Sequence, residues 1–101
     1  MKQPVVVLLG GNKLNRGIVE YCKSKSYFVV VVDWSPNAAL KGDLFLCIDV
    51  KEADKIINAL YEHGITEILG VYTSIDLAVR SVNAINAHYG LCHMSPSALV
   101  H

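Results

Sequence analysis

Apolar residues in this chain occur in short continuous runs, which alternate with longer stretches where they recur every three or four positions. The runs cover Val5–Leu9, Phe28–Val32 and Leu44–Ile48, and a fourth segment, Glu67–Tyr72, is apolar apart from Glu67 and Gly70. Their lengths are typical of β-strands. Strands that are apolar at successive positions are buried on both faces, as in a parallel sheet covered by helices. The pattern therefore predicts an α/β fold with an open, three-layer parallel sheet and helices on both faces.

The stretches between these runs have helical periodicity. Leu14–Lys25 is predicted to form a helix, a second helix follows the third run and stops at Gly64, and a third ends at Gly90. Asp49 stands three residues before Glu52, which resembles a capping box at the start of the second helix. The predicted apolar faces comprise Leu14, Ile18, Tyr21 and Cys22 in the first helix, Ala53, Ile56, Ile57, Leu60 and Tyr61 in the second, and Ala78, Val82, Ile85 and Tyr89 in the third.

The topology follows from the handedness of the connections. Right-handed crossovers between parallel strands predict the strand order 3-2-1-4, numbered along the chain. This order places a switch point between the first and fourth strands, and open α/β sheets bind ligands at such points, beyond the carboxyl ends of the strands. We therefore expect a substrate-binding crevice lined by Gly10, Gly11, Asn12, Asp33, Thr73, Ser74 and Asp76.

The residues that follow the first two strands also have purely structural interpretations. Gly10 and Gly11 either contact a ligand or only permit the turn after the first strand. Asn12 is favoured as a helix cap. Asp33 either accepts a hydrogen bond from a ligand hydroxyl or caps the turn that it forms with Ser35.

The same edge of the sheet carries groups suited to an anion. Thr73 and Ser74 are predicted to cap the third helix, which leaves their hydroxyls available to an anionic ligand at the helix N-terminus. Lys13 and Arg16, in the first turns of the first helix, either attract a phosphate or carboxylate or are simply solvated. We therefore expect the ligand to carry a carboxylate or phosphate group.

Composition and charge narrow the class of protein. The 101 residues suffice for one domain, and nine basic and nine acidic residues leave no positive excess that would suit nucleic acid. The apolar runs are too short to span a membrane, and the start of the chain lacks the pattern of a secretory leader. The three cysteines are scattered and odd in number, so no disulfide framework is expected and the predicted location is cytoplasmic.

Few side chains in the sequence are suited to catalysis or to metal binding. No two acidic residues have the spacing of a general acid/base pair. Cys92 with His93 and His101 matches no recognised zinc pattern, and Cys22 and Cys47 are predicted to be core residues. We therefore predict neither a catalytic residue nor a metal ligand in this chain.

The end of the chain has the chemistry of a helix start. Ser95 is suited to an N-cap and Pro96 to the first helical position, but too few residues follow for a stable helix. We expect residues 1–94 to form the domain and residues 95–101 to begin a linker helix of a longer protein, of which this chain is a fragment. Apolar surface exposed by such a cut predicts self-association into a homodimer.

A series of short motifs follows the predicted strands and helices: Leu8–Gly11, Val32–Asp33, Gly42–Asp43, Ile48–Asp49, Gly70–Thr73, Gly90–Leu91 and Ser95–Ala98. Their order and spacing resemble the N-terminal (pre-ATP-grasp) domain of ATP-grasp ligases. This family includes biotin carboxylase, the large subunit of carbamoyl-phosphate synthetase, purine-pathway ATP-grasp enzymes and amino-acid ligases. The resemblance covers essentially the whole chain.

The resemblance implies a Rossmann-like fold and a parent protein that is an ATP-dependent ligase. ATP and Mg in that family are bound mainly by later domains that are absent here, so no cofactor is expected in this chain. The first domain helps to form the site for the acceptor or carboxylate substrate, with a downstream ATP-grasp domain as its partner, and is expected to be inactive alone. Asn12–Lys13 and Thr73–Asp76 depart from the usual family residues, which leaves the acceptor substrate open.

Two other classes of protein are compatible with the pattern. A free-standing nucleotide- or small-ligand-binding Rossmann-like module is disfavoured, because Gly10–Asn12 lacks the glycine frame that brings a pyrophosphate close to the backbone. A receiver-type signalling domain would need an acidic pair after the first strand, where this chain has glycines.

Overall fold

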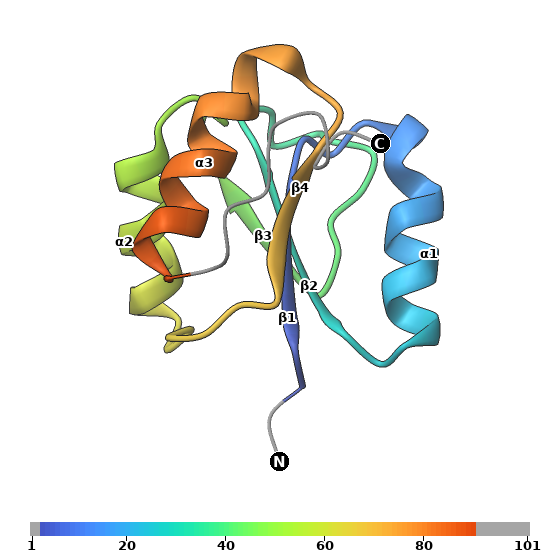
Figure 1. Ribbon diagram of the computed structural model, residues 1–101. Helices are drawn as coiled ribbons and strands as arrows, with labels where there is room; N and C mark the ends of the chain where they lie inside the picture. Colours follow the sequence, from blue (N-terminus) through green and yellow to red (C-terminus); the bar gives the residue numbers. More distant parts are fainter. Residues whose placement is uncertain (1–2, 91–101) are drawn as a thin grey trace.

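The computed structural model describes residues 3–90 (Figure 1). Four parallel strands form one sheet in the order β3-β2-β1-β4, which confirms the predicted topology. The strands are β1 (Val5–Leu9), β2 (Phe28–Asp33), β3 (Leu44–Cys47) and β4 (Gly70–Thr73). The helices are α1 (Arg16–Ser24), α2 (Ala53–Glu62) and α3 (Val79–His88), with 3₁₀ helices η1 (Lys13–Asn15) before α1 and η2 (Asp76–Ala78) before α3.

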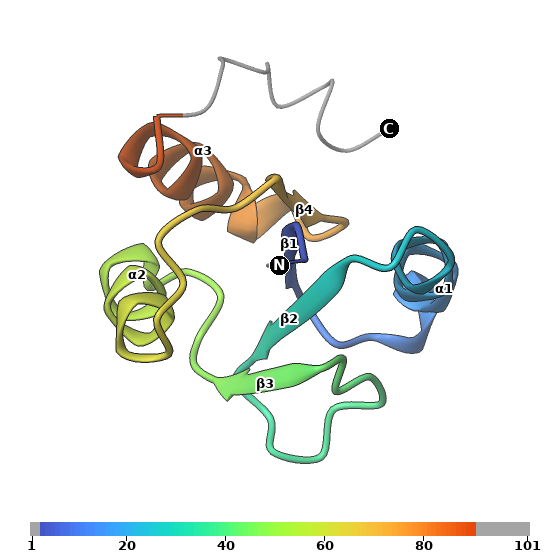
Figure 2. The same ribbon diagram turned by 90° about the horizontal axis from the view of Figure 1, so that it is seen from below.

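Helices cover both faces of the sheet. Helix α1 lies on one face, and α2 and α3 lie side by side on the other, as Figures 1 and 2 show together. Successive residues of a strand point to opposite faces, so the apolar runs of β1 and β2 feed both layers. Val7, Leu9, Val30 and Val32 pack with α2 and α3, whereas Leu8, Val29 and Val31 pack with α1. The predicted three-layer α/β fold is therefore confirmed.

The register brings three strand ends to one level. Leu9 of β1 lies opposite Val32 of β2 on one side and opposite Thr73 of β4 on the other. The loops that leave these strands therefore begin beside one another, at the top of the sheet in Figure 1. Strand β4 begins three residues later and ends one residue later than predicted, because it pairs with β1 from Gly70, opposite Val6, to Thr73, opposite Leu9.

The apolar face of the first helix differs from the prediction. Leu14 is 85% exposed and Tyr21 is 59% exposed, whereas Val19 and Cys22 are buried. Residues 13–15 form a 3₁₀ turn instead of the first turn of the α-helix, and a 3₁₀ helix advances by a different angle per residue. The periodicity of the α-helix therefore cannot be extended back to Leu14.

Cys47 is exposed, so its predicted place in the core is wrong. It ends β3, which is an edge strand, and it points to the face opposite the buried Leu46. Its Sγ donates to the carbonyl oxygen of Trp34 at 3.3 Å. Cys22, in contrast, is buried as predicted.

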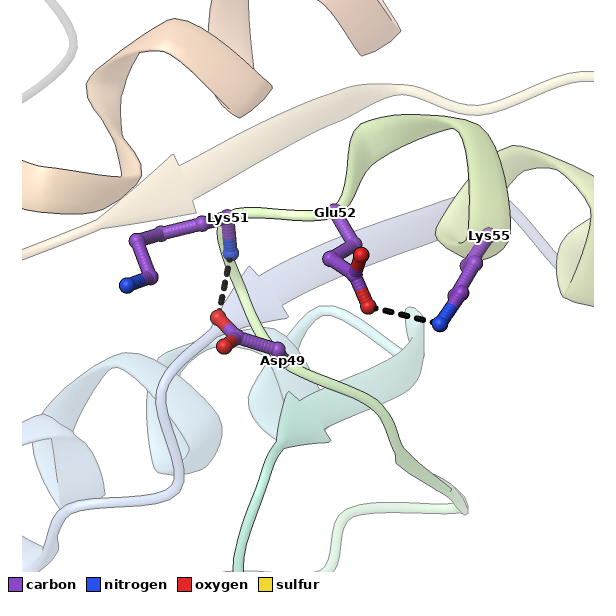
Figure 3. A network of polar contacts seen from close by, with 4 residues as sticks. All are labelled: Asp49, Lys51, Glu52 and Lys55. Carbon is purple, nitrogen blue, oxygen red and sulfur yellow. Dashed lines mark hydrogen bonds and ion pairs between the residues drawn. The ribbon is translucent and has the colours of Figure 1, made fainter.

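The predicted capping box at Asp49 and Glu52 does not form. Asp49 Oδ1 accepts from the backbone N–H of Lys51 at 2.9 Å, while the Glu52 carboxylate pairs with Lys55 at 2.8 Å (Figure 3). The backbone N–H of Glu52 donates to the Asp49 carbonyl at 2.9 Å, and this turn delays the start of α2 until Ala53. Asp49 therefore stabilises the turn before the helix and does not cap the helix itself.

The predicted helix start at Ser95–Ala98 and the boundary between residues 94 and 95 lie outside the described residues. So do Cys92, His93 and His101. Among residues 3–90, no helix is long and apolar enough to cross a membrane.

Candidate functional site

The candidate site lies where β1, β2 and β4 end. Strand β1 stands between the other two, and the chain leaves it toward α1 while it leaves β4 toward α3, on the opposite face. This divergence creates the switch point at which open α/β sheets place their ligands. All seven residues predicted to line the crevice lie at this point: Asp33 and Thr73 end β2 and β4, and the other five are in the loops after β1 and β4.

Gly10 begins the loop after β1 in a conformation that requires glycine. Its φ of +112° is one that L side chains rarely adopt, and its N–H donates to the Val32 carbonyl at 2.7 Å. A Cβ at Gly10 would lie 2.7 Å from Cδ1 of Ile75 in the loop after β4. The absent side chain thus lets the β1 and β4 loops approach each other closely.

Asn12 is the N-cap of η1, as predicted. Its Oδ1 accepts from the backbone N–H of Leu14 at 2.9 Å, and its backbone is extended. An N-cap of this kind satisfies one of the free N–H groups of the first turn. Asn12 is exposed, so its side-chain amide group still faces solvent beside the loop.

Asp33 connects the ends of β1 and β2. Its Oδ2 accepts from the backbone N–H of Gly11 at 2.8 Å, and its Oδ1 accepts from that of Ser35 at 2.9 Å. The second bond is the turn cap expected with Ser35. Each carboxylate oxygen can accept more than one hydrogen bond, so both oxygens keep capacity for a ligand hydroxyl.

Gly11 packs under the loop that follows β2. A Cβ at this position would lie 2.8 Å from both Cβ of Ala38 and the carbonyl oxygen of Leu40, and 3.2 Å from Val31. The carbonyl of Gly11 accepts from the Leu40 N–H at 3.0 Å. The direction in which a side chain would point is therefore filled by the chain itself, and only the position of Gly11 in the loop relates it to the crevice.

Thr73 does not cap the third helix. Its hydroxyl donates to the Leu9 carbonyl at 2.9 Å and accepts from the Ile75 N–H at 3.0 Å. The side chain is fully buried, whereas Ile75 and Ala78 occupy the N-cap positions of η2 and α3 without side-chain bonds. Thr73 thus joins β4 to β1, and the exposed Ser74 and Asp76 present the polar groups of this loop.

Asn15 is a residue of this region that the sequence pattern did not single out. It is buried, and its Nδ2 donates to the Gly10 carbonyl at 3.1 Å. The bond fixes the start of α1 against the glycine turn. In the sequence, Asn15 is marked only as a polar residue one helical turn before Val19. This is a weak indication of a structural role, because asparagine is common near helix starts.

Comparison with known proteins finds a solved structure of similar fold. No family model matches the sequence, and a search of curated proteins finds no match. Among solved structures, the crystal structure of N5-carboxyaminoimidazole ribonucleotide synthetase from Thermotoga maritima is similar, with a TM-score of 0.68 and 15% sequence identity. The similarity covers 96% of this chain and 26% of that one.

The fold of this chain is therefore similar to that of the N-terminal portion of this synthetase, an ATP-grasp ligase. The chain spans about a quarter of the length of the synthetase that it matches. The resemblance to the pre-ATP-grasp domain is therefore confirmed at the level of the fold.

The surroundings of the loops combine positive charge with apolar surface. Lys13 and Arg16 are exposed at the starts of η1 and α1. Leu14, Trp34 and Leu77 follow β1, β2 and β4 and are 85%, 72% and 72% exposed. Among residues 3–90, no group of three or more His, Cys, Asp or Glu side chains could hold a metal ion.

A groove of about 470 Å³ lies at the opposite edge of the sheet. Its lining comes from the amino ends of β1 and β2 and from the loop between α2 and β4: Gln3, Pro4, Val5, Phe28 and residues 64–69. None of the residues predicted for the substrate crevice lines this groove. It offers mainly apolar side chains and lies away from the switch point, where ligands of this architecture bind.

Proposed function

We propose that this chain is the acceptor-side domain of an ATP-dependent ligase of the ATP-grasp type. The observation that carries the proposal is the similarity of 96% of the chain to the N-terminal portion of such a ligase. The paired loops at the switch point support it, because they provide a place for a small substrate. An ATP-grasp domain in the same polypeptide would complete the active site.

ATP and Mg would be bound mainly by that other domain. Phosphoryl transfer requires cations and metal-binding carboxylates positioned around the phosphates. Among residues 3–90, the acidic side chains do not gather in such a group. We therefore expect the 101-residue chain to be catalytically inactive by itself.

The proposed acceptor is a small molecule with a carboxylate or phosphate group. The loops at Gly10–Asn12 and Ser74–Asp76 would line its site, with Asp33 available to a hydroxyl. The exposed cations Lys13 and Arg16 favour an anion at this edge. Asp33 keeps its negative charge, and its carboxylate is stabilised by two backbone N–H donors.

The surroundings of Gly11 disfavour a free-standing dinucleotide-binding module. In such modules, the glycine loop lets the pyrophosphate approach the backbone. Here Ala38, Leu40 and Val31 already occupy the space on the Cα side of Gly11.

Two experiments test the proposed function. First, calorimetric titration and a phosphate-release assay of the 101-residue chain should detect neither tight Mg-ATP binding nor ATP hydrolysis. Sub-micromolar Mg-ATP affinity would overturn the proposal and favour a nucleotide-binding module.

The second experiment uses a longer polypeptide that carries this domain. Arg16→Glu should raise the KM of the acceptor by about tenfold, as expected from the loss of a charged contact, with little change in the KM of ATP. Lys23→Glu, in the last turn of α1, is the matched control and should change neither. A larger effect on the KM of ATP would contradict the assignment of this edge to the acceptor.

A further inference from the structure

Asn15 stands at the N-cap position of α1, yet its side chain makes no hydrogen bond to that helix. Asparagine at this position ordinarily accepts from an N–H group of the first turn. Here the residue is only 3% exposed, and its Nδ2 donates to the carbonyl oxygen of Gly10 at 3.1 Å. The side chain therefore holds the turn after β1 instead of the helix that it begins.

The peptide group between Gly10 and Gly11 is bonded at both of its polar atoms. Its carbonyl oxygen accepts from Asn15 Nδ2, and its N–H donates to Asp33 Oδ2 at 2.8 Å. The carbonyl and the N–H of a planar trans peptide point in opposite directions, so the two side chains hold this group from opposite sides. Asn15 and Asp33 thus fix its orientation, and its single donor is used within the protein.

We propose that Asn15 is a positioning residue of the acceptor site and acts through the Gly10–Gly11 peptide. Without its bond, Asp33 alone would hold this peptide by hydrogen bonding, and the glycine on each side permits rotation that other residues would resist. Residues 12–16 follow directly and include the exposed cations Lys13 and Arg16. A loop that is already ordered binds its ligand more tightly, because less ordering accompanies binding.

This role rests on the proposed function for the location of the acceptor site, and it adds what keeps the β1 loop in place for the ligand. A first test measures the peptide without a ligand, by amide hydrogen exchange of the 101-residue chain. Asn15 does not bond to the Gly11 N–H, which donates to Asp33. Asn15→Ala should nevertheless speed exchange of the Gly11 amide by about tenfold relative to the amide of the fully buried Val31.

Asn86→Ala is the matched control. Asn86 is also a buried asparagine, but it lies in α3, and its Oδ1 has no hydrogen-bond partner within residues 3–90. Its replacement should leave the ratio of the Gly11 and Val31 exchange rates unchanged. The ratio removes the effect of global unfolding, which speeds the exchange of both amides.

A second test titrates inorganic phosphate into the same chain and follows the amides of residues 12–16 by NMR. Asn15→Ala should weaken phosphate binding by about tenfold, as expected for the loss of one hydrogen bond. Asn86→Ala should leave the affinity unchanged, even where it lowers the stability equally. A purely structural role of Asn15 would lower the stability alone. Asn15→Ser provides the same comparison if the alanine variant does not fold.

An unchanged exchange ratio or an unchanged phosphate affinity in the Asn15 variant would each overturn the positioning role. Phosphate shifts of residues 12–16 in the wild type would in that event keep the proposed anion site, without a role for Asn15. A wild type in which phosphate shifts none of these amides would overturn the anionic acceptor and the role of Asn15 together.

Discussion

The carboxylate of Asp33 accepts a hydrogen bond from the backbone N–H of Gly11 at 2.8 Å, across 22 positions of the sequence. This contact joins the turn after β1 to the end of β2, and the second carboxylate oxygen closes the next turn through Ser35. The loops that follow β1 and β2 therefore depend on one acidic side chain.

Replacing this carboxylate by an amide should destabilise the protein. In Asp33→Asn only one side-chain oxygen remains as an acceptor, so either Gly11 or Ser35 loses its bond. We expect a loss of about 1–3 kcal/mol in the free energy of unfolding, measured by urea denaturation. Asp54→Asn on the exposed surface of α2 is the control, and an equal loss in both variants would contradict the prediction.

The buried hydroxyl of Thr73 should matter in the same way. Thr73→Val keeps the shape of the side chain but removes a donor to Leu9 and an acceptor for Ile75. The expected cost is about 1–3 kcal/mol, whereas Thr73→Ser retains both bonds and should lose less. The exposed Thr66→Val should be nearly neutral. Similar stabilities of the valine and serine variants would show that the hydroxyl is unimportant.

Adding a methyl group should have opposite effects on stability at Gly11 and at Gly17. Gly11→Ala places a Cβ 2.8 Å from the Leu40 backbone oxygen, and such overpacking costs about 1–3 kcal/mol. Gly17 lies in α1, where an added Cβ would meet nothing within 4 Å, so Gly17→Ala should stabilise the protein by up to about 1 kcal/mol. Thermal unfolding would measure both, and effects of the same sign would refute the packing described for Gly11.

The stability of the protein should fall at alkaline pH through Tyr89. Burial, with a smaller effect from the neighbouring Tyr61, raises the pKa of the Tyr89 hydroxyl, which donates to the Ile65 carbonyl at 3.0 Å. The folded state thus holds this proton more tightly than the unfolded chain. The resulting stability is fully present below about pH 10 and is lost as the pH rises through the higher pKa of the folded state.

Tyr89→Phe separates this effect from general alkaline unfolding. It should cost about 1 kcal/mol near neutral pH through the lost hydrogen bond and should show a shallower decline in stability above about pH 10. Urea denaturation across the alkaline range measures both quantities. Tyr21→Phe, at an exposed position, is the control, and parallel declines in the wild type and Tyr89→Phe would argue against the role of Tyr89.

The two cysteines of the described region should differ in reactivity. Cys22 is buried, and burial raises the pKa of its thiol, whereas Cys47 is exposed. Because the thiolate is the reactive form, iodoacetamide should modify Cys47 well before Cys22 in the native protein, as followed by peptide mass mapping. Both should react at similar rates in urea, and equal rates in the native state would contradict the structure.

Much of the fold follows from local patterns in the sequence. Continuous valine and leucine runs predict strands buried on both faces, and the right-handed crossover rule then allows few strand orders. The bounds of β1 agree with the run at Val5–Leu9. The function of Asn12 as a cap was also predictable, because capping depends on bonds within one turn of the chain.

Only the tertiary structure decided which partners the polar side chains of the candidate site use. Thr73 was predicted to cap the third helix. Its hydroxyl instead donates to the carbonyl oxygen of Leu9, 64 positions away, because β4 lies beside β1 in the sheet. Cys47 was predicted to lie in the core, but it ends an edge strand and is exposed. Hydrophobic periodicity is a local property that the sequence itself determines, whereas burial and hydrogen-bond partners depend on neighbours that only the assembled sheet brings together.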